Sequence, residues 1–163
     1  MELLIVIVVV GILATISIVA YNGVSSRAND SKRKDDVAKI AKAMQLWTVD
    51  TGKSFREMNT GWNSNGATGW HSSDYGGGSL RTHLANAGYL SSTIEEPARS
   101  SNRGYLVAVC TNNADNRRVV MAQLDSPPTQ TLTEQISSHS CANSQINSGI
   151  ATYGANYAIV VGG

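Results

Sequence analysis

Glu2 is the ionisable residue with the most unusual position in this sequence, because it stands at the head of a long apolar run. The 18 residues from Leu3 to Ala20 include no charged residue and no proline. A run of this length is typical of a helix that spans a membrane. A carboxylate at the edge of hydrocarbon is costly unless it has a partner. The sequence therefore predicts a role for Glu2 beyond simple anchoring.

Cys110 and Cys141 are the next residues whose types predict chemistry. Two cysteines in an exported domain predict one disulfide, and two buried free thiols are the alternative. A disulfide that closes a loop of about 30 residues stabilises a fold by about 3.5 kcal/mol in the chain-entropy treatment. Paired CxxC spacing, which would indicate a zinc site, is absent from the sequence.

The remaining reactive side chains form no recognisable catalytic or cofactor-binding pattern. Gly76-Gly77-Gly78 lacks the lysine and strand context of a phosphate-binding loop. Asp115 and Asp125 lack the clustered oxygens of a calcium site. The three histidines have no metal-ligand spacing: His71, His83 and His139. We therefore predict that the chain is not an enzyme and needs no cofactor or metal.

Three aromatic residues, Trp62, Trp70 and Tyr75, lie in a stretch rich in glycine, asparagine and serine. Exposed aromatic rings in such a loop could bind a surface by stacking on sugars or bases, or could contact a neighbouring subunit. The alternative is that they anchor an irregular loop onto its own core. The charges of the 13 basic and 12 acidic residues nearly cancel, so the net charge does not indicate binding to nucleic acid, although nucleic acid remains a possible partner.

One long helix must position Glu2 and the apolar run. No proline precedes Pro97, and Gly52 is a natural helix stop, so we expect a helix over residues 1–52. Residues 1–21 form its membrane-spanning part and residues 22–52 an amphipathic part, whose apolar stripe includes Val37, Ile40 and Met44. We expect its charged residues to form a solvated face with i, i+4 pairs: Lys32, Asp35, Asp36 and Lys39.

The rest of the chain, residues 53–163, is predicted to form a globular head. Residues 53–79 read as a loop, and Ser79 is placed to cap a short helix ending near Ala87. An antiparallel sheet is expected within residues 104–163, with strands at 104–110, 117–124 and 157–161. Thr131 and Glu134 have the spacing of a capping box for another short helix. The predicted fold class is α+β, with the long helix packed on a small antiparallel sheet.

The N-terminal residues resemble those of type IV pilins and pseudopilins. The matching residues include Glu2, the filament-core or membrane positions that follow it, and then Tyr21, Arg27 and Ala28. The filament-core positions are Leu3, Leu4, Ile5, Val6, Ile7, Gly11, Ile12 and Leu13. In that family the glutamate equivalent to Glu2 meets the N-terminal amine of a neighbouring subunit during assembly. Several pilins of the family have a proline where this chain has Val19, so we expect a more continuous helix here.

The resemblance implies a structural subunit that polymerises into an extracellular type IV pilus for adhesion, motility or DNA uptake. It also implies a leader removed by a prepilin peptidase, which we expect to precede the residues printed here. Further implied partners are other copies of the chain in a helical filament, the pilus assembly machinery and a host or cell surface. Within the family, a pseudopilin of a type II secretion or competence system is the alternative. A membrane-tethered adhesin that never polymerises is the alternative outside it.

The basic residues after the apolar run are evidence on which side of the membrane the rest of the chain lies. The positive-inside rule would place in the cytoplasm the basic residues that follow the run closely: Arg27, Lys32, Arg33 and Lys34. The predicted disulfide and the resemblance place that side outside. We expect a single-pass protein of the cytoplasmic membrane that later becomes part of an extracellular pilus.

Overall fold

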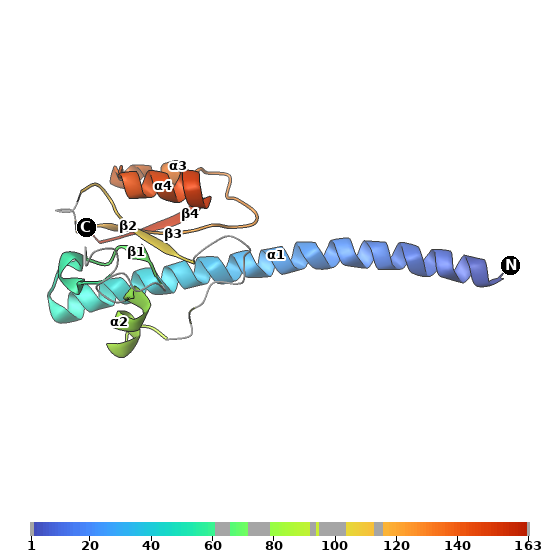
Figure 1. The fold of residues 1–163 in the computed structure, drawn as a ribbon, viewed down its shortest axis with the longest axis horizontal. Helices are drawn as coiled ribbons and strands as arrows, with labels where there is room; N and C mark the ends of the chain where they lie inside the picture. Colours follow the sequence, from blue (N-terminus) through green and yellow to red (C-terminus); the bar gives the residue numbers. More distant parts are fainter. Residues whose placement is uncertain are drawn as a thin grey trace.

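The computed structural model describes residues 2–60, 66–71, 79–91, 94, 104–112 and 116–162, without the side chains of Glu2 and Val19. A single helix, α1 (Glu2–Thr51), extends far beyond a head formed by the rest of the described chain (Figure 1). At about 1.5 Å per residue it is roughly 75 Å long. Gly52 follows with φ 68°, the left-handed conformation of a helix stop, as predicted.

The head contains a four-stranded antiparallel sheet in the order β1-β2-β3-β4. Its strands are β1 (Gly69–Trp70), β2 (Leu106–Val109), β3 (Arg118–Ala122) and β4 (Tyr157–Val161). The predicted hairpin is present, with Val107 opposite Val120. This long helix and small antiparallel sheet make the fold α+β, as the sequence predicts.

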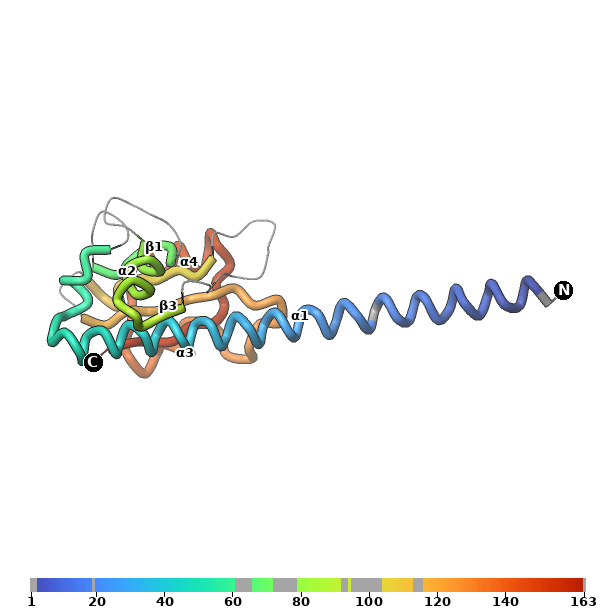
Figure 2. Tube along the Cα trace, turned by 90° about the horizontal axis from the view of Figure 1, so that it is seen from below, coloured from blue at the N-terminus to red at the C-terminus, as the bar shows by residue number. Residues whose placement is uncertain are grey.

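Helices lie on both faces of the sheet, so the head has three layers (Figure 1), and the view from below shows α1 running along the length of the head (Figure 2). The C-terminal part of α1 packs on β3 and β4, and α2 (Leu80–Asn86) lies beside α1. On the other face, α3 (Leu132–Ile136) covers β4 and α4 (Ser144–Tyr153) covers β2. Two short 3-10 helices complete the described elements: η1 (Phe55–Met58) and η3 (Ser137–His139).

Each face of the sheet has its own apolar core because side chains alternate along a strand. Val107 and Val120 face α1, where they join Val37, Ile40, Met44 and Trp47. Ala108 and Val119 face the opposite way, toward Leu132, Ile136 and Ile146. This two-sided burial explains why β2 and β3 are apolar at nearly every position.

Local capping signals correctly locate two of the short helices. The Ser79 hydroxyl accepts a hydrogen bond from the Thr82 backbone N–H at 3.0 Å, at the start of α2. The capping box of Thr131 and Glu134 is present at the start of α3. Its hydrogen bonds from Thr131 lower the pKa of Glu134.

Three elements differ from the sequence prediction. The predicted loop 53–79 contains η1 and β1, and β1 adds a fourth strand outside residues 104–163. The third, α4, lies in a segment where no helix was predicted. The small residues of α4 have weak helix preference, but they let the helix pack closely on the sheet. A Cβ on Gly149, for example, would come within 3.1 Å of Leu106 Cδ2 and Met121 Cε.

Candidate membrane and assembly interface

The N-terminal part of α1 is an apolar rod that extends away from every other described part of the chain. Its large apolar side chains from Leu3 to Ile18 are each between 48% and 76% exposed, on every side of the helix. This set includes every apolar filament-core residue predicted from the sequence: Leu3, Leu4, Ile5, Val6, Ile7, Ile12 and Leu13. Apart from the backbone of its own helix, nothing lies within 4 Å of a Cβ built on Gly11. By length and composition, α1 could span a membrane.

The rod is continuous helix across Gly11 and Val19, as the sequence predicts from the missing proline. Its two hydroxyl groups bond back to the helix: Thr15 Oγ1 donates to the Gly11 carbonyl and Ser17 Oγ to the Leu13 carbonyl, both at 2.8 Å. Both hydroxyls are therefore satisfied within the helix, as a lipid-facing or helix-packed surface requires. Glu2 begins α1 at the end farthest from the head, and its side chain lies outside the described part of the chain.

Exposed cations follow the rod along α1, where the helix reaches the head. They are Arg27, Lys32, Lys34, Lys39 and Lys42. Lys39 Nζ lies 2.5 Å from Asp35 Oδ2, and this bond raises the pKa of Lys39. The i, i+4 pair of Asp35 and Lys39 is therefore confirmed.

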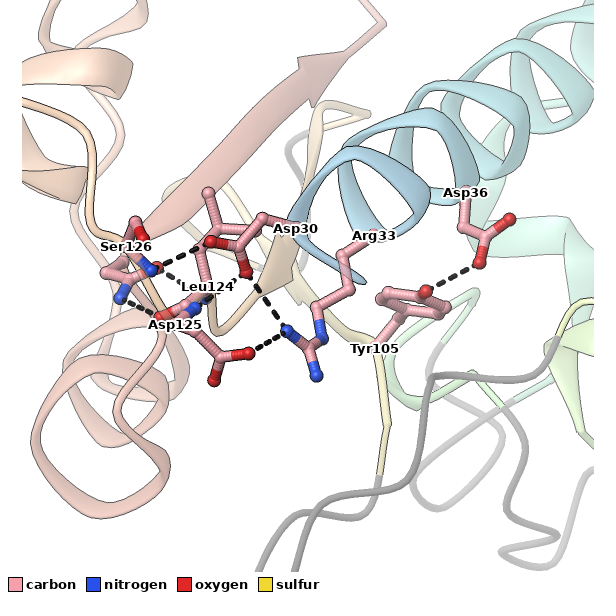
Figure 3. Close-up of polar contacts among 8 residues, drawn as sticks. Asp30, Arg33, Asp36, Tyr105, Leu124, Asp125 and Ser126 are labelled. Atoms are coloured by element: carbon pink, nitrogen blue, oxygen red, sulfur yellow. Dashed lines mark hydrogen bonds and ion pairs between the residues drawn. The ribbon is translucent and has the colours of Figure 1, made fainter. Parts of the chain in front are cut away.

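A buried polar network fastens α1 to the head just after the rod ends (Figure 3). Arg33 Nη1 lies 3.0 Å from Asp30 Oδ1 and 3.0 Å from Asp125 Oδ2. The two Asp30 oxygens also accept the backbone N–H groups of Asp125 and Ser126, at 2.7 and 2.8 Å. Asp30 and Arg33 are 5% and 1% exposed, so both charges are held almost without water. We call Asp30, Arg33 and Asp125 the latch.

A second buried bond lies one turn farther along α1. Asp36 is 4% exposed and accepts a hydrogen bond from the Tyr105 hydroxyl at 2.7 Å, as Figure 3 shows. This corrects the prediction that Asp36 belongs to a solvated face. A signal for both buried charges was present in the sequence, because Arg33 precedes Val37 by four residues and Asp36 precedes Ile40 by four. Each therefore continues the apolar stripe toward the N-terminus.

The disulfide prediction is confirmed by a bond between Cys110 and Cys141, with an S–S distance of 2.01 Å. It joins the end of β2 to the segment that precedes α4. The bond thus ties the far layer of the head to the sheet, and it leaves α1 unconstrained.

The structure places one of the three aromatic candidates. Trp70 lies in β1, is only 6% exposed and meets Tyr153 edge to face, with ring centroids 4.8 Å apart. It is therefore a core residue, as expected from the alternative in which these rings anchor the loop onto its own core, and not an exposed loop aromatic. Trp62 and Tyr75 lie outside the described residues.

His71 is the buried histidine of the head. It is 1% exposed, its ring meets that of Tyr105, and its Nε2 has no hydrogen-bond partner among the described residues. Burial, with a smaller contribution from the charge of Arg81, lowers the pKa of His71 to about 4. No group of three metal-ligating side chains occurs in the described ranges. Asp125, one of two aspartates weighed for calcium, is engaged with Arg33, and Asp115 lies outside those ranges.

Comparison of this chain with protein-family models, curated proteins and solved structures finds no match.

Proposed function

We propose that this chain is a type IV pilin-like structural subunit, held in the cytoplasmic membrane by the apolar rod and then assembled into an extracellular helical filament. The observation that carries the proposal is the rod itself, apolar on all sides and uncovered by its own head. Soluble monomers rarely expose so large an apolar surface. Lipid covers the rod before assembly, and the rods of other copies cover it afterwards.

The exchange of lipid for protein explains why a charged residue heads the rod. Lipid already keeps these side chains from water, so packing between helices, and not the hydrophobic effect, must favour the filament. Glu2 fixes the register of that packing by pairing with the N-terminal amine of a neighbouring copy. At 4 Å and an effective dielectric near 20, such a pair attracts by about 4 kcal/mol before desolvation is subtracted. A copy in the wrong register leaves the carboxylate unpaired, which is costly.

The latch suits the same function. A head that must follow its helix from the membrane into a filament needs a rigid connection to it. Asp30 and Arg33 supply that connection at the point where the rod meets the head, and they bind a loop about 95 residues farther along the chain. Pulling on the rod therefore moves the head with it.

The test is replacement of Glu2 in the complete precursor, expressed in its own cells. We expect Glu2→Ala and Glu2→Gln to insert into the membrane at normal levels and to give no filaments in sheared extracellular material under the electron microscope. Glu57→Gln, which removes an exposed charge of the head but keeps a side-chain acceptor for the Ser54 N–H at the start of η1, is the matched control and should give normal filaments. Normal filament yield from Glu2→Ala would refute the proposed role of Glu2. A wild-type chain that stays monomeric in the membrane would favour a tethered adhesin.

A further inference from the structure

A cleft of about 310 Å³ opens on the face of the head that lies away from α1. It lies between the N-terminal half of α4 and the β1–β2 edge of the sheet. Leu106 forms part of its floor, Trp70 and Tyr153 form an aromatic wall, and Ser144, Gln145 and Ser148 supply polar groups. Its volume is within the roughly 300–1,000 Å³ range of small-molecule sites.

The fold holds this cleft open by fixed contacts. Gly149 lets α4 approach the sheet closely, since a Cβ there would meet Leu106 and Met121 at 3.1 Å. The Asn143 side chain caps α4 by accepting the Gln145 backbone N–H at 2.8 Å. Gln145 Oε1 accepts the Val109 backbone N–H at 3.4 Å. The first turn of α4 is thus fixed against β2, and the cleft does not have to be created by the ligand.

The aromatic wall is also fixed in orientation. The Trp70 ring meets the Tyr153 ring at 84°, with centroids 4.8 Å apart. Trp70 is nearly buried, so it acts as a support, whereas Tyr153 is only half-buried and presents part of its ring to the cleft. An aromatic side chain of this kind offers an apolar face together with a polar hydroxyl.

The chemistry of the lining points to one class of ligand. All the described residues that line the cleft have uncharged side chains, so the lining offers no ion pair to an anionic or cationic ligand. Two serine hydroxyls, one turn apart on α4, both donate and accept hydrogen bonds, and the Gln145 amide adds two N–H donors. A sugar ring has the complementary surface: a face of C–H groups to lie against Tyr153 and a rim of hydroxyls for the serines and Gln145.

We propose that this cleft binds a neutral saccharide, with Tyr153 under the sugar ring and Ser144, Gln145 and Ser148 bonded to its hydroxyls. The inference goes beyond filament assembly and concerns the head alone. It is compatible with assembly because α4 and α1 lie on opposite faces of the sheet (Figure 1). A filament with α1 inside would present the cleft outward.

The probes are the neutral methyl glycosides of glucose, galactose, mannose and N-acetylglucosamine. We would titrate them into the full ¹⁵N-labelled chain in a zwitterionic detergent, because detergents with sugar headgroups would compete. We expect at least one glycoside to bind with a Kd on the order of 1 mM, a weak affinity that suits a single ring in a shallow site. The shifted signals should be the Trp70 indole N–H and the backbone amides of residues 144–148.

Two substitutions on exposed positions of α4 make a matched pair. Ser148→Leu fills the cleft and removes one hydroxyl, so we expect at least tenfold weaker binding. Asn147→Leu places the same side chain one residue away, outside the lining, and should bind as the wild type does. A spectrum that retains the signals of the folded head shows that each variant is intact. The proposal is overturned if none of the four glycosides shifts the cleft signals, if Ser148→Leu binds as tightly as Asn147→Leu, or if a sulfated glycoside binds more tightly than its neutral parent.

Discussion

The two halves of α1 form one unbroken helix in two different surroundings. From Leu3 to Ile18 the apolar side chains point in all directions and touch no other element. From Asp30 to Trp47 the buried residues lie on one side, against the sheet, while lysines cover the other side. The spacing of apolar residues therefore predicts the buried side of the second half, because that half packs on the head. In the first half it predicts no buried side, because no described part of the chain covers the helix there.

The difference also shows where polar residues are tolerated. In the first half, the Thr15 and Ser17 hydroxyls are satisfied by the helix's own carbonyls. In the second half, Asp30, Arg33 and Asp36 are buried because partners from the head complete their bonds. A buried charge without those partners would cost several kcal/mol.

The largest expected effect comes from breaking the latch. Arg33→Ala leaves the Asp30 carboxylate buried without its cation, and we expect it to lower the free energy of unfolding by about 3–5 kcal/mol. Leu13→Ala, in the exposed rod, should change the stability of the head by less than about 0.5 kcal/mol in detergent. The measurement is guanidinium unfolding in a zwitterionic detergent, followed by near-UV circular dichroism. Lys42→Ala, on the exposed side of α1, is the control for Arg33, and equal effects from the two would contradict the comparison.

The second effect comes from the disulfide, which belongs to the layer farthest from α1. Replacement of both Cys110 and Cys141 by alanine should lower the free energy of unfolding by about 3.5 kcal/mol, because the unfolded chain is no longer constrained by a closed loop of about 30 residues. Membrane insertion of the rod should not change, since the bond leaves α1 unconstrained. A loss of insertion together with stability would show that the rod and the head are not independent.

His71 gives a smaller, pH-dependent effect in the layer between α1 and the sheet. Its pKa is about 4 in the folded head and 6.5 in an unperturbed histidine, so the unfolded state binds more protons between these values. Stability must therefore fall as the pH is lowered through this window, by about 3 kcal/mol over its whole width. Urea unfolding at pH 7 and pH 5 avoids most carboxylate titration. His71→Gln should flatten the dependence, whereas His139→Gln, at an exposed position, should preserve it. An unchanged slope in His71→Gln would contradict this account.

The smallest effect is expected from the exposed ion pair on α1. Asp35→Ala removes the partner of Lys39, and exposed pairs of this kind contribute only about 0.5 kcal/mol. A thermal melt should therefore show almost no shift. A loss comparable to that of Arg33→Ala would mean that the outward face of α1 is covered even in the isolated chain.

Local patterns predicted much of this molecule because they act within a few residues. The stop at Gly52, the caps at Ser79 and Thr131 and the alternation in β2 and β3 are all of this kind. The α4 helix also carried local signals that the prediction did not use: a cap at Asn143 and Gly154 after its last turn, with φ 67°. Its composition of serine, glycine and threonine concealed them, because such residues have weak helix preference.

The remaining features depend on contacts between distant parts of the chain. Asp30 meets the loop at Asp125 and Ser126, and Asp36 meets Tyr105. The cleft joins residues of β1 and β2 to residues of α4. No spacing in the sequence indicates these pairs. The burial of Trp70 is of the same kind, because it depends on Tyr153.

The most direct test of the central claim is to find what covers the rod in extracellular material. A photo-crosslinking amino acid at Leu13, in the complete precursor expressed in its own cells, should join the chain to further copies of itself and give a ladder of oligomers after shearing. The same group at the exposed Asn147, on α4 across the sheet from α1, should give few oligomers. Crosslinks from position 13 to lipid alone, with no oligomer from any cell fraction, would contradict the claim that rods of neighbouring copies replace the membrane.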